Sequence, residues 1–171
     1  MTFAKLSLVI IVIGLYSVTG QGQCATKQNQ KSAWTSPSGR FQLIVPFPPT
    51  EPSEDPSSNE SVSIYGGRHG HCGYLIAVVR PANNDSSKST PQELARWKYL
   101  LIGETPHEYT EKPARVDGLP AIEIVDNVRV SRGFVIEDGN QTYVVGYFGD
   151  KPEDLRKKEG KKFLASFKLT K

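Results

Sequence analysis

The sequence predicts an α+β fold, with a central antiparallel sheet of about six strands and helices packed on it. Short runs rich in Val, Ile and Tyr alternate with turn signals along most of the chain. Two of these signals, Asp117-Gly118 and Asp138-Gly139, are dipeptides that favour tight hairpins. Only two segments combine a helical pattern with a helix start, one in the middle of the chain and one near its end. At 171 residues, with 37% apolar and 23% charged residues, we expect one domain with its own core.

The first twenty residues predict a secretory signal peptide. Lys5 precedes thirteen uncharged residues, 6–18, and Val18-Thr19-Gly20 supplies small residues at a cleavage site. Thirteen apolar residues are too few for a helix that crosses a bilayer, which needs about twenty. We therefore expect export to the periplasm or the extracellular space, with no transmembrane segment after cleavage. Polar residues 21–33 predict a flexible lead-in, and residues 34–171 a single domain.

The first half of this domain predicts three strands and a long loop. Residues 40–45 alternate into an apolar run that Pro46 ends, and five prolines between positions 46 and 59 keep that segment out of a sheet. Residues 61–65 alternate with period two and residues 74–79 are apolar, which predicts a strand pair. The four glycines between these runs predict their hairpin connection.

The first helix is predicted by its start signal and its spacing. Thr90 is a capping residue, Pro91 suits the first helical position, and Glu93 completes a capping box. Trp97 and Leu101 continue an apolar stripe, so the pattern predicts an amphipathic helix to about residue 102.

The second half predicts an antiparallel meander followed by a helix. Residues 121–125, 128–136 and 142–148 are the expected strands. A final helix is expected to begin at residues 151–154, although Gly160 weakens it by about 1 kcal/mol relative to Ala. Residues 166–169 predict a closing strand.

Several short segments together resemble a known family. They are Trp34, Ser38-Gly39-Arg40-Phe41, Val45-Pro46, residues 117–121, residues 139–143 and residues 162–169. In order and spacing, over residues 34–169, they are similar to the PsbP-like family. The resemblance implies an α/β/α sandwich with a central antiparallel sheet. It implies relatives as different as an extrinsic photosystem subunit, a nuclear Ran-binding protein and exported bacterial proteins, and it transfers no catalytic residue.

Histidine and cysteine residues cluster in the glycine-rich hairpin. His69 and His71, two apart on a strand, would point to the same side and are weak candidate metal ligands. A metal site needs a third ligand, and no spaced partner motif is present, so an exposed hairpin tip is the competing interpretation. In an oxidising compartment Cys72 and Cys24 are a possible disulfide, with two unpaired cysteines as the alternative.

No pattern in the chain predicts an enzyme. Hydrolase, zinc-protease and phosphate-loop motifs are absent from the sequence. Glu104, His107 and Glu108 are close enough in sequence to supply an acid and a base, or to be ordinary loop residues. We expect no catalytic residue and no cofactor.

Five basic residues give the predicted final helix a positive character: Arg156, Lys157, Lys158, Lys161 and Lys162. They are suited either to an anionic lipid surface or acidic partner, or to a solvated face balanced by the interleaved acids. The net charge of +3 is too small to predict nucleic-acid binding.

The leading hypothesis is an exported, non-catalytic domain that binds a protein partner or an envelope surface. The loop of residues 46–56 and the hairpin around His69 are its candidate contact regions, because long loops often carry function. The alternative is an exported metal- or small-ligand-binding protein that uses His69 and His71.

Overall fold

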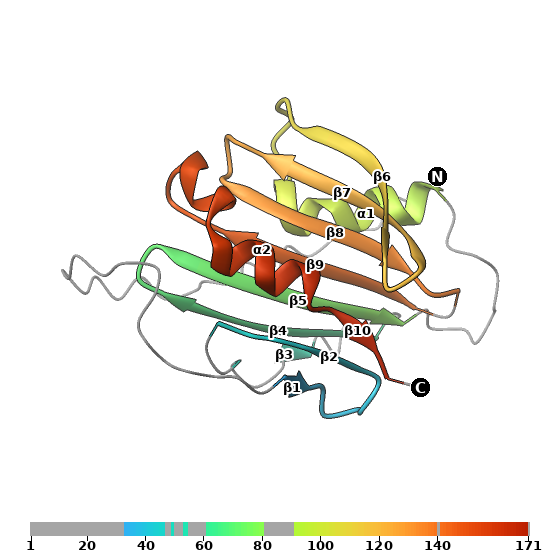
Figure 1. Cartoon of the computed structure of the whole chain (residues 1–171). Coiled ribbons are helices and arrows are strands. Elements are labelled where there is room, and N and C mark those ends of the chain that lie inside the picture. The colour runs from blue at the N-terminus through green and yellow to red at the C-terminus, as the bar shows by residue number, and fades with distance from the viewer. Residues whose placement is uncertain are drawn as a thin grey trace.

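A large antiparallel sheet dominates the computed structural model, which describes residues 33–46, 49, 53–54, 61–80, 91–139 and 141–170. The sheet has seven strands in the order β3-β4-β5-β9-β8-β7-β6 (Figure 1). These are β3 (Ser53–Glu54), β4 (Ser61–His69), β5 (Cys72–Arg80), β6 (Thr110–Val116), β7 (Leu119–Asp126), β8 (Ser131–Glu137) and β9 (Thr142–Phe148). The predicted signal peptide and lead-in lie outside the described residues.

The seven strands form two consecutive meanders that meet at one seam. Strands β3, β4 and β5 pair with their neighbours in the chain, and so do β6, β7, β8 and β9. The two meanders join where β5 pairs with β9, in a register that sets Ile76 opposite Val145. Helix α1 (Pro91–Ile102) lies between them in the chain. Strand pairing within each meander therefore joins neighbours in the chain, whereas the seam joins strands that are far apart in the sequence.

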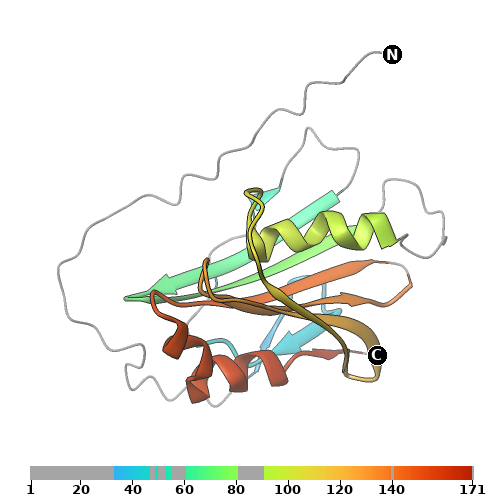
Figure 2. The same cartoon turned by 90° about the horizontal axis from the view of Figure 1, so that it is seen from above.

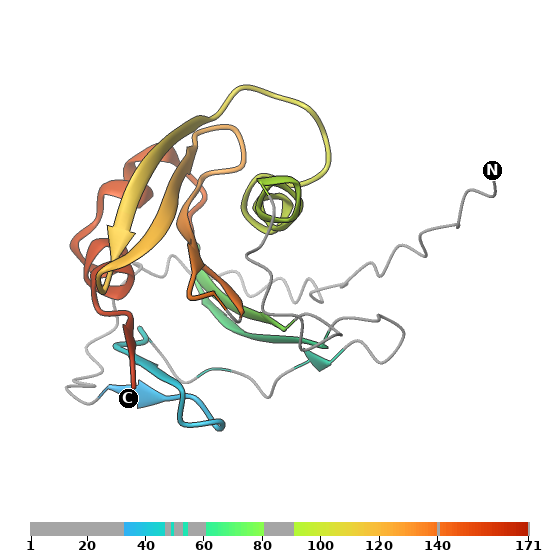
Figure 3. The same cartoon turned by 90° about the vertical axis from the view of Figure 1, so that its right-hand side faces the viewer.

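A second, small sheet brings the two ends of the described chain together. Strand β2 (Phe41–Leu43) pairs with β1 (Trp34–Thr35) on one side and with the C-terminal β10 (Lys168–Leu169) on the other. A 3₁₀ helix, η1 (Pro152–Arg156), and helix α2 (Lys158–Ala165) precede β10. Figures 2 and 3 show α1 on one face of the large sheet, and α2 with the small sheet on the other.

Each face of the large sheet has its own apolar core. We call them the α2-side core and the α1-side core. On the α2 side, residues of β5 and β9 pack against the small sheet and α2, with Phe41, Phe163 and Phe167 almost fully buried. On the α1 side, Trp97 and Leu101 pack against aliphatic residues of the same sheet.

The expected α+β fold with helices packed on a six-stranded sheet, and the α/β/α sandwich that the resemblance implied, are wrong. The chain is mostly β, with antiparallel sheets of three and seven strands and only two short α-helices among the described residues. The error came from residues 40–45 and 166–169, which were expected to belong to the central sheet or simply to close the chain. They form the second sheet instead. The layer on the α2 side of the large sheet, which was expected to consist of helices, therefore contains strands as well.

Most individual elements follow the sequence pattern. The expected strands at 61–65, 74–79 and 142–148 are present, and α1 has the predicted length. The predicted turn at Asp117-Gly118 is confirmed, since both residues have the positive φ angles (51° and 81°) of a type I′ hairpin. The strand expected at 128–136 begins only at Ser131, because residues 127–130 form a turn. Strand β6 was not predicted. The expectation that prolines keep residues 46–59 out of a sheet is wrong for Ser53–Glu54, which lie between Pro52 and Pro56 and pair with β4 as the short edge strand β3.

The expected final helix is divided. Lys157 has an extended conformation, with ψ of 149°, and separates η1 from α2. Gly160 is not a weak point of α2 but a close approach, because a Cβ atom there would lie 2.5 Å from the ring of Tyr147. The glycine lets the helix backbone lie directly on β9.

The edge of the large sheet at β6 is unsuited to pairing with another strand. Pro113 sits in the middle of this exposed strand and removes one backbone donor, and Lys112 and Arg115 add charge beside it. In the part of the chain that the structure describes, no helix is long and apolar enough to span a bilayer.

Candidate functional site

The hairpin that carries the candidate metal ligands ends in a tight turn. Strand β4 ends at His69 and β5 begins at Cys72, so Gly70 and His71 form the turn, with Gly70 at a φ of 56°. The expectation that His69 and His71 lie on one strand is therefore wrong, since His71 lies in the turn beyond the end of β4. The side chain of His69 is outside the described part of the structure.

His71 has a carboxylate partner instead. Its Nδ1 contacts Asp150 Oδ2, and the Nη2 atom of Arg68 lies 3.3 Å from the other oxygen of the same carboxylate. All three side chains are well exposed, so solvent screens this pairing. Among the described side chains, no group of three His, Cys, Asp or Glu residues is arranged to hold a metal ion.

Cys72 lies one residue after this turn and is buried, with 2% of its surface exposed. The described residues include no free cysteine. Its expected partner Cys24 lies outside the described residues, so the Cys24–Cys72 disulfide stays a prediction.

His107 is joined to a residue that the sequence did not suggest. Glu104 and Glu108 are exposed, whereas the Nε2 atom of His107 lies 2.5 Å from Asp126 Oδ2 at the end of β7. Asp126 is fully buried, and its other oxygen accepts the backbone N–H groups of Val128 and Arg129 at 2.8 and 2.9 Å. One carboxylate therefore holds both the β7–β8 turn and the loop after α1.

The second ring nitrogen of His107 is also occupied. Nδ1 lies 2.7 Å from the carbonyl oxygen of Thr105, so both nitrogens face acceptors. The hydrogen bonds to Asp126 and Thr105 favour the imidazolium form, in which both nitrogens donate, and they raise the pKa of His107 above 6.5. In this geometry no ring nitrogen is left to accept a proton from a substrate. His107 instead links the loop after α1 to the β7–β8 turn through hydrogen bonds.

The basic segment near the C-terminus, residues 151–170, carries more than the whole net positive charge of the chain. Residues 151–170 contain seven Lys or Arg and three Asp or Glu, a net charge of +4 in a chain whose total is +3. The rest of the chain therefore carries a net charge of −1. The positive charge of this protein is concentrated in η1, α2 and β10.

The acids of this segment do not screen its surface as expected. Asp154 is buried, accepts the N–H groups of Asp150 and Lys151 at 3.1 and 3.0 Å, and pairs with Lys157 at 2.6 Å. Burial alone would raise its pKa, but these hydrogen bonds outweigh that effect and lower it. Glu159 is only partly exposed, which leaves Glu153 as the exposed acid of the segment.

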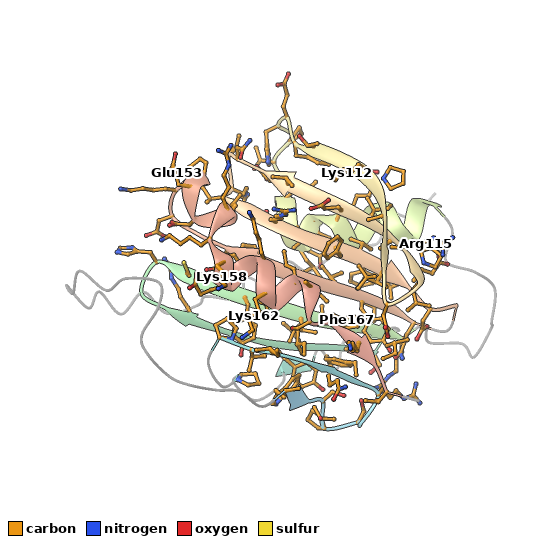
Figure 4. The ribbon with its side chains drawn as sticks, viewed as in Figure 1. Lys112, Arg115, Glu153, Lys158, Lys162 and Phe167 are labelled. Carbon is orange, nitrogen blue, oxygen red and sulfur yellow. The ribbon has the colours of Figure 1, made fainter. Side chains whose placement is uncertain are left out.

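We define the basic face as five exposed cationic residues, none of which pairs with an acid among the described residues. They are Lys151, Arg156, Lys158, Lys161 and Lys162. Figure 4 places Lys158 and Lys162 along α2, on the outer side of the molecule, and Glu153 at the η1 end. The apolar residues of α2 point the other way, since Phe163 and Leu164 are 1% and 4% exposed.

A buried carboxylate on the same side of the large sheet was missed from the sequence. Glu123 in β7 is 6% exposed and receives Arg132 from β8 at 2.6 Å and Lys112 from β6 at 3.0 Å. Burial would raise its pKa, but the two cations lower it below the usual value. Only the pairing of three strands reveals the group, because its members lie on three successive strands at spacings that no local sequence pattern marks. It balances charge within the sheet.

A second polar group that the sequence did not indicate lies where β8 turns into β9. Asp138 accepts the backbone N–H of Gln141 at 2.8 Å, and the hydroxyl of Tyr143 lies 3.3 Å from the same carboxylate. Burial, and then the negative charge of Asp138, raise the pKa of Tyr143. The group stabilises the predicted Asp138-Gly139 turn, in which Gly139 has a φ of 86°.

No family model, no curated protein and no solved structure matches the chain.

Proposed function

We propose that this protein is an exported, non-catalytic domain that acts by binding an anionic partner or envelope surface through its basic face. The observation that carries the proposal is the charge distribution: residues 151–170 hold a net charge of +4, and the remainder of the chain a net charge of −1. A concentrated charge of one sign attracts and orients an oppositely charged surface.

The arrangement of the acids supports this proposal. Asp154 is used internally, as the acceptor of two backbone donors and the partner of Lys157. The five cations of the basic face then remain on the surface without a described acidic partner. Glu153 and Glu159 lie three residues before Arg156 and Lys162, a spacing at which ion pairs can form, but in the described part of the chain neither pair forms.

Two further considerations agree with a binding role. The predicted signal peptide would deliver the chain to an envelope compartment. His107, the strongest candidate for a general base, has both ring nitrogens engaged.

The test is retention of the purified protein on the envelope fraction of its native source. We expect binding at low salt and release by about 0.5 M NaCl, where charges more than about 4 Å apart are largely screened. The double variant Lys158→Gln/Lys162→Gln should bind more weakly, whereas Lys158→Arg/Lys162→Arg should bind like the parent. Equal retention of parent and Gln variant would refute the role of the basic face.

A further inference from the structure

The structure points to the kind of surface that the basic face binds: we propose that it is an anionic phospholipid surface, to which α2 adsorbs peripherally. This inference rests on the proposed function and names the partner of the same site. It commits to lipid rather than to an acidic protein, for three reasons that concern the side chains in and around the basic face.

The first reason is that the basic face has no apolar anchors. Among the described residues, the exposed large apolar side chains are Tyr99, Tyr109 and Val128. They belong to α1, to the segment before β6 and to the β7–β8 turn, and none lies in η1, α2 or β10. Protein interfaces draw most of their binding energy from buried aromatic and Arg side chains at their centre. A lysine surface without such anchors is suited to a charged bilayer, for which clustered basic residues suffice.

The second reason is the choice of cation. Four of the five residues of the basic face are lysines, and Arg156 is the single arginine. Arginine forms planar, bidentate pairs with individual carboxylates, whereas the lysine ammonium is a compact point charge on a flexible stem. Lysines therefore fit a diffuse array of phosphate headgroups better than they fit fixed carboxylates on a protein.

The third reason concerns how α2 would lie on the membrane. Helices that insert into a bilayer interface bury an exposed apolar side among the acyl chains. In α2 that side is already used, because Phe163 packs on Tyr74 with ring centroids 5.2 Å apart and Leu164 is 4% exposed. Figure 3 shows α2 on the outer side of the large sheet, away from α1, so the lysines can reach a flat surface while the helix stays packed. Adsorption is then electrostatic and reversible by salt.

The experiment measures binding of the purified protein to vesicles by co-sedimentation. One set of vesicles is phosphatidylcholine alone, and the other contains roughly one-third phosphatidylglycerol. We expect binding to the anionic vesicles only, and release by about 0.5 M NaCl. Each basic residue near an anionic surface contributes about fivefold to affinity, so Lys158→Gln/Lys162→Gln should bind about thirtyfold more weakly.

Matched variants separate position from total charge. Arg115→Gln removes one exposed cation from β6, at a distance from α2 in Figure 4, and should change the affinity by less than about twofold. The single variant Lys162→Gln removes the same charge from the basic face and should weaken binding about fivefold. All three exchanged side chains, Arg115, Lys158 and Lys162, are exposed, so the variants should keep the melting temperature of the parent, which a thermal melt checks.

The outcomes distinguish this inference from the function it rests on. Binding to anionic vesicles that the lysine variants weaken supports the lipid proposal. Retention on the native envelope fraction without binding to anionic vesicles overturns the lipid proposal, and identifies an acidic protein or polymer as the partner. Vesicle binding that is equal in the parent and in Lys158→Gln/Lys162→Gln also overturns it. Failure to bind either preparation removes the proposed function as well.

Discussion

The two faces of the large sheet are built from very different parts of the chain. The α2-side core joins the first and last described segments, and its aromatic rings contact one another: Phe41 stacks on Phe167 and meets Trp34, Tyr65 and Tyr143 edge-on, with centroids 5.6–6.3 Å apart. The α1-side core is made by one helix, and Trp97 is the only aromatic residue among its fully buried members.

The difference between the two cores predicts which face of the protein is more stable and which opens more readily. Aromatic side chains bury the largest areas and interact further through their ring geometry, so the α2-side core should carry most of the folding free energy. The α1 side depends on Trp97, Leu101 and a few loop contacts, and local opening should begin there. The basic face lies over the stable side, which keeps its lysines on a rigid support.

The largest effect is expected from truncating the centre of the α2-side core. Phe41→Ala leaves a cavity among four aromatic rings and should lower the free energy of unfolding by about 4 kcal/mol. Leu101→Ala on the α1 side should cost about 3 kcal/mol, because its neighbours are smaller and can close the gap. Urea denaturation of both variants measures the difference, and a larger loss for Leu101→Ala would reverse the ranking of the two faces.

A smaller effect is expected from adding one methyl group to each face. Gly160→Ala places a Cβ 2.5 Å from the ring of Tyr147, which is buried and cannot move, and should cost about 2 kcal/mol. Gly146→Ala meets the Cδ2 atom of Leu101 at 2.4 Å, which is the end of a flexible side chain, and should cost about 1 kcal/mol. The control is Gly146→Ala in a Leu101→Ala background, where most of that cost should disappear. If it persists, Leu101 is not the obstacle.

Opposite pH dependences should distinguish the faces further. On the α1 side, the pKa of His107 is raised, so its stabilising effect is fully present below about pH 6.5 and is lost as the pH rises through the folded-state pKa. On the α2 side, the pKa of Glu123 is lowered, so its effect is present above about pH 4.5 and is lost as the pH falls through the folded-state pKa.

The measurement is amide hydrogen exchange against pH. Exchange in α1 and in residues 103–109 should quicken as the pH rises above about 6.5, beyond the intrinsic effect of pH, and His107→Gln should abolish that excess. The strands β6–β8 should lose protection only in acid, and Glu123→Gln should remove that acid dependence. An excess that survives in His107→Gln would show that another group titrates.

The smallest effect is expected at the β4–β5 turn, which belongs to neither core. His71 is engaged by Asp150, and no third described ligand is near, so zinc or copper should shift the melting temperature by less than about 1 °C. A thermal melt with and without metal tests this. A clear shift that His69→Ala/His71→Ala abolishes would restore the metal-binding alternative.

The sequence was informative wherever local chemistry decides structure. The Asp117-Gly118 turn needs two positive φ angles, which these residue types favour, and the structure confirms it. Thr90 lies outside the described residues, so the capping box expected there stays a prediction. Strand β6 was missed because its sequence, with Lys112 and Pro113 at the centre, does not alternate apolar and polar residues. An edge strand whose residues are mostly exposed to solvent does not need that alternation. Its neighbour β7 supplies the hydrogen bonds that define it.

The functional surfaces were only partly predictable. The cluster of basic residues was visible in the sequence, but its interpretation depended on which acids are buried. Only the fold shows that Asp154 is buried and pairs with Lys157, so that neither contributes to the charge of the basic face. The partner of His107, Asp126, lies at the end of β7, and the contact arises from the register of β6 with β7 rather than from spacing along the chain. The second sheet depends on pairing between the two chain ends, for which no local signal exists.

The seam between β5 and β9 has a kinetic consequence. Each meander can form by successive hairpins with short loops, at a rate that local contacts allow, whereas pairing Ile76 with Val145 must enclose α1 and three strands. We expect the seam to form late and to limit the refolding rate. Until it closes, each meander presents an unpaired inner strand, and two chains that meet at that stage can exchange halves across the seam to give an intertwined dimer. Refolding at high protein concentration is therefore the condition under which this fold is most prone to misassembly.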